Sequence, residues 1–419
     1  MARQVQVSPQ SRKRHSLIAA IEAERRSKVI TYFLGDRQNA GAAVAEDAVR
    51  PLYDHIKSVG NSEKIDLFLY TLGGAMEVPW RIVTMIREFA DEFAVLVPYK
   101  SLSAGTLIAL GADEIVMGPK GELGPIDPQV QIPTGGQGGT AQQRQMSVED
   151  MMSYLDFLRE KVGLTDQTAL SGAVALLVEK VDPWVVGQVN RIHSHIRDVA
   201  RKLLTGRSKK APLGEQQINS IIESLAEKTY QHGHAIGRTE AASIGLKIVR
   251  PSRKIESRMW SLYEAYEELC KLRTPIDLRT FVPSGKDEHT ERLVLGCIES
   301  SRAAHHFAID FCCRNKRGAT PQISLNLNVS VQWPPDVQLD QLPADAQQAV
   351  QKILQQVQPL IQQEVMSAVQ QQVQQQMPIT GFDPWMQDGA WRKLADWPTT
   401  SQARRTGKKR TGSRQSSRG

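Results

Sequence analysis

Ser103 is the residue whose neighbours most favour chemistry. It follows an apolar run over 93–99 that is typical of a strand, and Ala104-Gly-Thr then begins a run of small residues typical of a helix. Gly73 and Gly74 end the preceding predicted strand. Backbone N–H groups at glycine turns and helix N-termini can hold the oxyanion that forms when a carbonyl is attacked. A serine hydroxyl facing such donors would suit acyl transfer.

Each of these features also has a simpler explanation. Ser101 or Ser103 could serve only as a helix N-cap, and the glycine pair could be only a turn. Ser101 could also replace Ser103 as the nucleophile if the strand ended two residues earlier. Only Ser103 is followed by Ala-Gly-Thr, however, so Ser103 is the favoured candidate.

The combination of motifs resembles a known family. The strings LGG, SLSAGTLIALGADEIVMGP and GELGPIDPQ, followed by QHGHAIGRTEAASIGLKIV over 231–249, resemble the serine dehydrogenase proteinase family. This family is related to ClpP and to the SppA signal-peptide peptidases. The resemblance covers about residues 17–255 and implies a ClpP/crotonase-like serine peptidase. Leu72 stands where the family is expected to have proline.

The resemblance implies a role for each matched residue. Ser103 would be the nucleophile, His232 the general base and Asp127 the carboxylate that orients the imidazole. Asp127 also reads as an ordinary turn residue, because it precedes a proline. The oxyanion donors would come from Gly74 and Ala104, with Gly73 shaping the turn.

Residues other than His232 could also serve as the general base. His234 lies two residues beyond His232 and could take its place, although a histidine before a helix is often only solvated. SppA-like relatives use a Ser-Lys pair, for which Lys100, Lys120 and Lys161 are candidates. Lys100 adjoins the motif, but neighbouring strand residues point to opposite faces.

The elements that must position these residues alternate along the chain. Helices over 17–27, 41–58, 76–91 and 103–111 are interleaved with strands over 29–35, 65–74, 93–99 and 114–119, and helices return up to about residue 231. This alternation predicts an α/β domain with a largely parallel, layered β-α-β core and a helical extension. A flexible loop is expected over 134–140.

The whole chain is predicted to contain five parts. The predicted parts are a basic flexible arm (1–16), the peptidase domain (17–255), a small α+β module (256–340) with a strand over 323–333, a glutamine-rich amphipathic helix (341–377) that Pro359 should kink or divide, and a mostly disordered basic tail (378–419).

The composition of the chain limits the compartment, partners and ligands that can be expected. The chain has four cysteines without a CxxC pair, which favours a reducing cytoplasmic compartment. Much of the net charge of +7 lies at the two ends, which could contact nucleic acid weakly and without specificity. No apolar run is long enough to span a membrane. His193 and His195, like His305-His306 with Cys312-Cys313, lack the spacing of a zinc site, so neither metal nor cofactor is expected.

The resulting hypothesis is an ATP-independent serine peptidase acting on peptides or unfolded protein segments. The resemblance also implies a homo-oligomer, to which the glutamine-rich helix could contribute. Two alternatives remain open: an assembly scaffold whose triad is degenerate, and a crotonase-like acyl-CoA enzyme that needs no nucleophile.

Overall fold

The computed structural model divides the chain into two compact units. It describes residues 9–126, 129–134, 142–147, 154, 157–178, 183–207, 212–226, 234–324, 332 and 341–394. The first unit contains the described residues up to Ile276, together with Arg292–Ile309 and those from Asp388 onward. The second unit contains Asp277–Glu291 and Asp310–Gln387. The boundary therefore falls inside three long strands.

The core of the first unit is built on an eight-stranded sheet of order β12-β7-β5-β4-β1-β13-β14-β15. The first five of these strands are parallel, and β13 runs antiparallel to β1. The last six residues of β4 are all buried, as expected for a strand covered on both faces. The bounds are β1 Lys28–Leu34, β4 Ser62–Tyr70, β5 Ala90–Val97, β7 Glu114–Met117, β12 Ile248–Val249, β13 Glu288–Ser300, β14 Ala304–Arg317 and β15 Ile379–Lys393.

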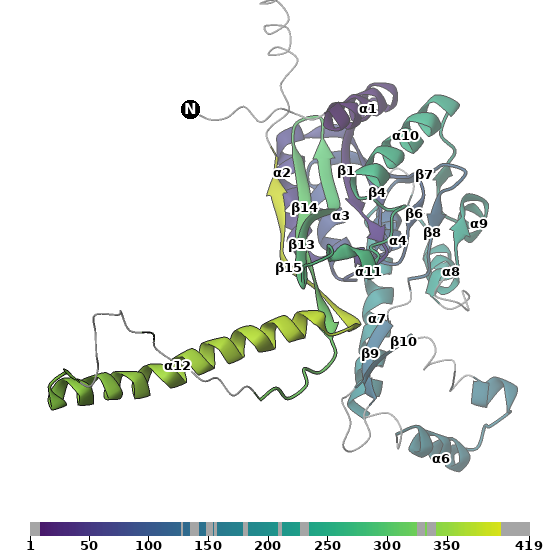
Figure 1. Ribbon diagram of the computed structural model, residues 1–419. Coiled ribbons are helices and arrows are strands. Elements are labelled where there is room, and N and C mark those ends of the chain that lie inside the picture. The colour runs from purple at the N-terminus through teal and green to yellow at the C-terminus, as the bar shows by residue number, and fades with distance from the viewer. Residues whose placement is uncertain are drawn as a thin grey trace, which may run out of the picture. The chain divides into compact units, whose positions relative to one another are not determined.

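Helices cover both faces of this sheet (Figure 1). α1 and α10 pack together on one face, where Ile18, Met259 and Tyr266 join a cluster with the strand residues Phe33 and Phe68. α2, α3, α4, α7 and α8 bury their apolar sides on the opposite face. The bounds are α1 Pro9–Arg25, α10 Arg253–Leu269, α2 Val49–Val59, α3 Val78–Arg87, α4 Ala104–Leu110, α7 Pro183–Thr205 and α8 Glu215–Ala226.

Shorter elements complete the described chain. A second sheet of order β11-β8-β6 lies beside the nucleophile motif and is treated below. The bounds are β2 Asp36–Arg37, β3 Ala40–Gly41, η1 Glu46–Ala48, β6 Lys100–Ser101, β8 Glu122–Leu123, β9 Gln129–Thr134, β10 Gln142–Ser147, η2 Phe157–Lys161, α6 Gln167–Val178, β11 Ile236–Gly237, α9 Arg238–Ile244, α11 Leu278–Phe281 and α12 Ala344–Gln376.

The predicted flexible arm is wrong for residues 9–16. α1 begins at Pro9, and Arg14 is only 1% exposed. The Arg14 guanidinium donates to both carboxylate oxygens of the buried Glu299, at 2.8 to 3.2 Å. The basic cluster misled the prediction because the acidic partner lies far along the chain, on β13.

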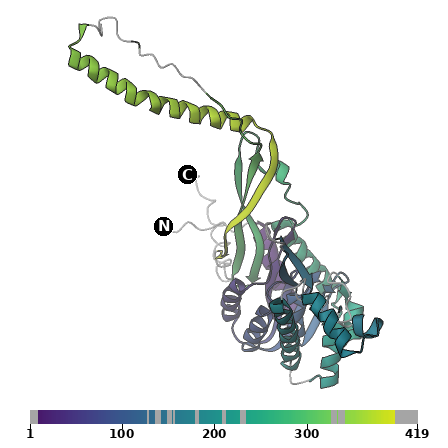
Figure 2. The same ribbon diagram turned by 90° about the horizontal axis from the view of Figure 1, so that it is seen from below.

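The prediction for the C-terminal third also needs correction. The separate module expected over 256–340 does not match the observed units, because α10 and much of β13 and β14 belong to the first unit. The disordered tail is wrong for 379–393, which form β15 at the edge of the sheet. Figure 2 shows β13, β14 and β15 side by side. The strand expected over 323–333 lies mostly outside the described residues.

Two other elements differ from expectation. The glutamine-rich helix is α12, and Pro359 lies inside it without dividing it (Figure 2). The helix expected over 41–58 begins only at Val49, because Val44 is held extended by hydrogen bonds to the backbone of Gly73 and Ala75. Most of the expected loop over 134–140 lies outside the described residues, between the paired strands β9 and β10.

Candidate active site

The segment that follows β4 and the segment that contains Ser103 lie side by side. The Thr71 N–H donates to the Lys100 carbonyl, and the Leu102 N–H donates to the Thr71 carbonyl, each at 3.0 Å. Thr71 and Ser101 thereby form a parallel bridge beyond the end of β4. The segment that leads to the glycine pair and the segment that leads to the serine turn are therefore joined by main-chain hydrogen bonds.

Gly73 and Gly74 are required where they stand. Both have positive φ, +116° and +148°, which favours glycine. A Cβ atom added to Gly73 would lie 2.7 Å from the Ser103 Cβ, and one added to Gly74 would lie 2.3 Å from the Val44 carbonyl oxygen. The absence of side chains thus allows the Gly73 backbone to lie against Ser103.

Ser103 occupies a strained turn at the start of α4. Its φ of 52° and ψ of −111° are unusual for a residue with a side chain, and such conformations cost about 1–3 kcal/mol. The side chain makes no capping hydrogen bond to α4. The Ser103 Oγ instead donates to the Met76 thioether at 3.5 Å, a weak interaction, and the residue is only half-buried. The simple explanation of Ser103 as an N-cap therefore fails.

Two backbone donors beside this turn are unused. The Gly73 N–H is taken by the Thr71 Oγ1 at 3.0 Å. In the part of the chain that the structure describes, the N–H groups of Gly74 and Ala104 have no hydrogen-bond acceptor. Gly73 therefore shapes the turn, while Gly74 and Ala104 keep N–H groups that could serve an oxyanion.

Thr106 fixes the turn from behind, a role that sequence reasoning missed. Its buried hydroxyl donates toward the carbonyls of Ser101 and Gly124, at 3.0 and 2.9 Å, and accepts from the Gly124 N–H at 3.0 Å. Gly105 allows this close packing, because a Cβ there would lie 2.6 Å from the Thr71 Cγ2. A threonine three residues after the nucleophile was the available signal, but its partners could not be read from the sequence.

Ser101 does not offer a competing nucleophile. It is fully buried, and its Oγ has no hydrogen-bond partner. A serine enclosed in this way cannot meet a substrate, which leaves Ser103 as the accessible hydroxyl of the motif.

The sheet β11-β8-β6 brings three chain segments to one edge. β6 runs parallel to β8, and β11 runs antiparallel to β8 with Ile236 opposite Leu123. The end of β6, the end of β8 and the start of β11 therefore meet at the same edge of this sheet. Ser103 follows β6, whereas Asp127 follows β8 and His232 precedes β11. Asp127 and His232 themselves lie outside the described residues.

The alternative bases are placed as follows. His234 is exposed, and its Nε2 lies 2.9 Å from the Glu240 Oε1. The Lys100 ammonium is paired with the Asp36 Oδ2 at 2.9 Å, and Asp36 also accepts from the Tyr70 hydroxyl at 2.8 Å. Burial alone would lower the pKa of Lys100, but Asp36 outweighs it and raises that pKa. A lysine held protonated in this way is disfavoured as a base.

No group of three or more His, Cys, Asp or Glu side chains that could hold a metal ion occurs in the described ranges. Within those ranges, no helix combines the length and the apolar character needed to cross a membrane.

The fold and the serine turn define a mixed α/β protein in which a strained serine stands at the start of a helix. A family model described as ClpP-like SDH-type serine proteinase matches residues 1–152. This segment contains the glycine pair and Ser103, so the chain is similar to that family over the part that carries the candidate site.

Other comparisons give more distant similarity. Two uncharacterized proteins of Methanocaldococcus jannaschii are each 23% identical to this chain. The first match covers 67% of this chain and 88% of the relative, and the second covers 61% of this chain and 77% of the relative. The chain is also similar to solved structures of the 1510-N membrane-bound stomatin-specific protease. One mutant of it matches at 17% identity and a TM-score of 0.29, covering 52% of this chain and 79% of that one. A second mutant, in complex with a substrate peptide, matches at 18% identity and a TM-score of 0.29 over 51% and 74%. An enoyl CoA isomerase from M. smegmatis matches at 13% identity and a TM-score of 0.28 over 58% and 79%.

Proposed function

We propose that this chain is a serine peptidase that hydrolyses peptide bonds through an acyl-enzyme at Ser103. The observation that supports this most is the Ser103 turn: the backbone of Ser103 is strained, its hydroxyl does not cap α4, and the N–H groups of Gly74 and Ala104 have no acceptor among the described residues. Strain at a residue with a side chain is often retained at functional sites. A helix start that served only the fold would instead be expected to use the hydroxyl as a cap.

The proposed base and carboxylate are His232 and Asp127. The shared edge of the sheet β11-β8-β6 supports this choice, because the segments that carry both residues leave the sheet where the serine segment leaves it. His232 would take the Ser103 proton, and Asp127 would orient the imidazole and stabilise its charged form. His234, paired with Glu240, is the second choice for the base.

The reaction would proceed in two halves. The Ser103 Oγ gives its proton to the imidazole and attacks the peptide carbonyl carbon, and the Gly74 and Ala104 N–H groups hold the resulting oxyanion. The amine leaves with the proton from the imidazole, which leaves an ester on Ser103. Water then gives a proton to the same imidazole and attacks the ester carbonyl. As this second intermediate collapses, the imidazole returns the proton to the Ser103 Oγ and the acid product is released.

The proposed substrates are peptides or unfolded protein segments, hydrolysed without ATP. A reducing compartment such as the cytoplasm is proposed for the chain, which is consistent with the four cysteines being free and buried.

A fluorophosphonate probe tests the nucleophile directly. The wild-type chain should be labelled at Ser103, and Ser103→Ala should abolish the label. Ser101→Ala is the matched control and should keep it, because Ser101 is enclosed. Labelling together with ATP-independent hydrolysis of a denatured protein would support the peptidase. A folded wild-type chain that neither reacts with the probe nor hydrolyses peptides would favour the assembly scaffold.

A further inference from the structure

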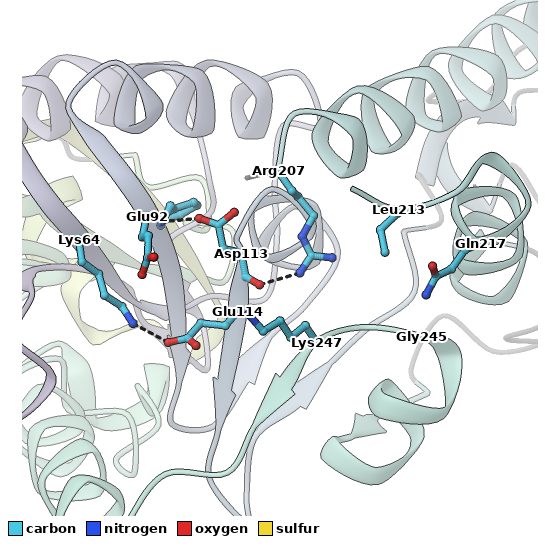
Figure 3. Close-up of a pocket in the computed structure, with 10 residues that line it drawn as sticks. Lys64, Glu92, Asp113, Glu114, Arg207, Leu213, Gln217, Gly245 and Lys247 are labelled. Carbon is cyan, nitrogen blue, oxygen red and sulfur yellow. Dashed lines mark hydrogen bonds and ion pairs between the residues drawn. The ribbon is translucent and has the colours of Figure 1, made fainter. Parts of the chain in front are cut away.

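A polar pocket lies at the end of the central sheet opposite to the proposed nucleophile. It is a cavity of about 260 Å³ at the amino ends of β4, β5 and β7, whereas Ser103 follows the carboxyl ends of the strands. Figure 3 shows its lining residues, which include Lys64, Arg207 and Lys247. The volume suits a small molecule rather than a large cofactor.

The carboxylates of this pocket are already engaged. Glu114 accepts from Lys64 at 2.7 Å and from Arg25 at 2.8 Å. Asp113 accepts two hydrogen bonds from Arg87, at 2.7 and 2.8 Å, and one from the Phe93 N–H at 2.8 Å. These pairs leave little free negative charge for another cation.

Arg207 is less well compensated than these groups. Its one hydrogen bond among the described residues goes from Nη2 to the Asp113 main-chain carbonyl, at 3.1 Å. In Figure 3 its guanidinium lies in the space between Asp113 and Leu213. Burial lowers the pKa of Arg207, and the neighbouring charge of Arg87 lowers it further against the attraction of Asp113. A partly buried guanidinium without a carboxylate of its own favours an anionic ligand.

The charge around the pocket supports the same conclusion. The lining contains Lys64, Arg207 and Lys247 against three carboxylates, and two more guanidinium groups, Arg25 and Arg87, pair with those carboxylates from behind. Arg25 also pairs with the buried Asp66, so five cationic groups stand against four anionic ones, which leaves one positive charge in excess.

The opposite wall adds a polar amide and room for the ligand. Gln217 and Gly245 face one another there, and a Cβ added to Gly245 would lie 3.6 Å from the Gln217 Nε2. Gly245 has a φ of +105°, so any other residue at this position would have a strained backbone.

We propose that this pocket binds a small anion, a phosphate or carboxylate group, between the Arg207 guanidinium and the Lys247 ammonium. The Gln217 amide would provide a further hydrogen bond. The site is separate from the proposed peptidase site and does not depend on Ser103.

Titration calorimetry on the full chain tests this proposal, with inorganic phosphate and succinate as separate probes at constant ionic strength. Saturable binding of either probe supports the site, and the tighter of the two shows whether phosphoryl or carboxylate chemistry is preferred. Arg207→Gln should weaken binding about tenfold or more, as loss of a charged hydrogen-bond donor predicts. Lys247→Gln, an exposed change that should not disturb folding, should weaken it several-fold.

Arg302→Gln is the matched control, because it removes an exposed guanidinium at the turn between β13 and β14. It should leave binding unchanged, and so should Ser103→Ala. The proposal is overturned if neither probe binds saturably to the folded chain. It is equally overturned if Arg207→Gln and Lys247→Gln bind as tightly as the wild type.

Discussion

Ser103 has a strained backbone and a side chain that does not cap α4, so the effects of this residue on stability and on activity can be separated. Ser103→Gly should relieve the positive φ and make the chain about 1 kcal/mol more stable than Ser103→Ala, as measured by urea unfolding. Both variants should lose about 10⁴-fold or more in peptidase kcat. Equal stability of the two variants would show that the turn stores no strain.

A second effect of single residues is expected in the buried cluster of charged side chains around Glu299. His306 Nε2 lies 3.2 Å from the Glu299 Oε1, beside Arg14 and the Tyr266 hydroxyl. Burial alone would lower the pKa of His306, but Cys297 and Glu299 outweigh it and raise the pKa to about 10. The negative charge beside His306 comes from Glu299, since burial raises the pKa of the Cys297 thiol and keeps that thiol neutral.

The sign of the pH dependence follows from this raised pKa. The folded state holds the His306 proton more tightly than the unfolded chain does, so the stabilisation is complete below about pH 6.5 and declines as pH rises toward 10. His306→Gln should cost about 3 kcal/mol at pH 6 and clearly less at pH 10, measured by urea unfolding at both values. A cost independent of pH would mean that His306 is not charged in the folded chain.

The position of α4 relative to its neighbouring elements is fixed by Thr106, whose hydroxyl forms hydrogen bonds to β6 and to the Gly124 segment. Thr106→Val keeps the shape but leaves the Gly124 N–H and two carbonyls without this partner, which should cost about 1–3 kcal/mol in urea unfolding. Peptidase activity should fall as well, because the Gly124 segment leads to Asp127. Thr106→Ser keeps the hydroxyl and should stay close to wild type in activity. Equal losses from both variants would point to packing rather than hydrogen bonding.

At the scale of the whole molecule, α12 bears an exposed apolar stripe. Leu360 is 62% exposed and Ile353 57% exposed, with Val357 and Ile361 at the same helical spacing. The helix has few charged residues, so two copies would repel each other little. We expect a second copy of this chain to cover the stripe, in line with the predicted homo-oligomer.

Light scattering coupled to size exclusion measures this assembly. Leu360→Glu should lower the mass of the particle or raise its dissociation constant about tenfold or more, because a charge would be buried in the contact. Gln355→Glu, at an exposed position on the side of α12 opposite the stripe, is the control and should leave the mass unchanged. A wild-type chain that is monomeric at all concentrations would contradict the expectation.

The sequence by itself determined the α/β core, because buried parallel strands appear as continuous apolar runs and their helices as local periodic patterns. It also determined Ser103 and the glycine pair, since their types and spacing reflect backbone geometry that few residues adopt.

Only the tertiary structure decided which groups face one another. The partners of Arg14, Lys100 and Thr106 are distant in the sequence, so their pairing could not be read from local pattern. The same is true of β13 and β14, which look like a separate module in sequence, and of β15, which looks like part of a disordered tail. All three extend the central sheet. Strand pairing depends on hydrogen bonds between backbones, and backbones are alike in every residue, so the sequence carries little record of which strand finds which neighbour.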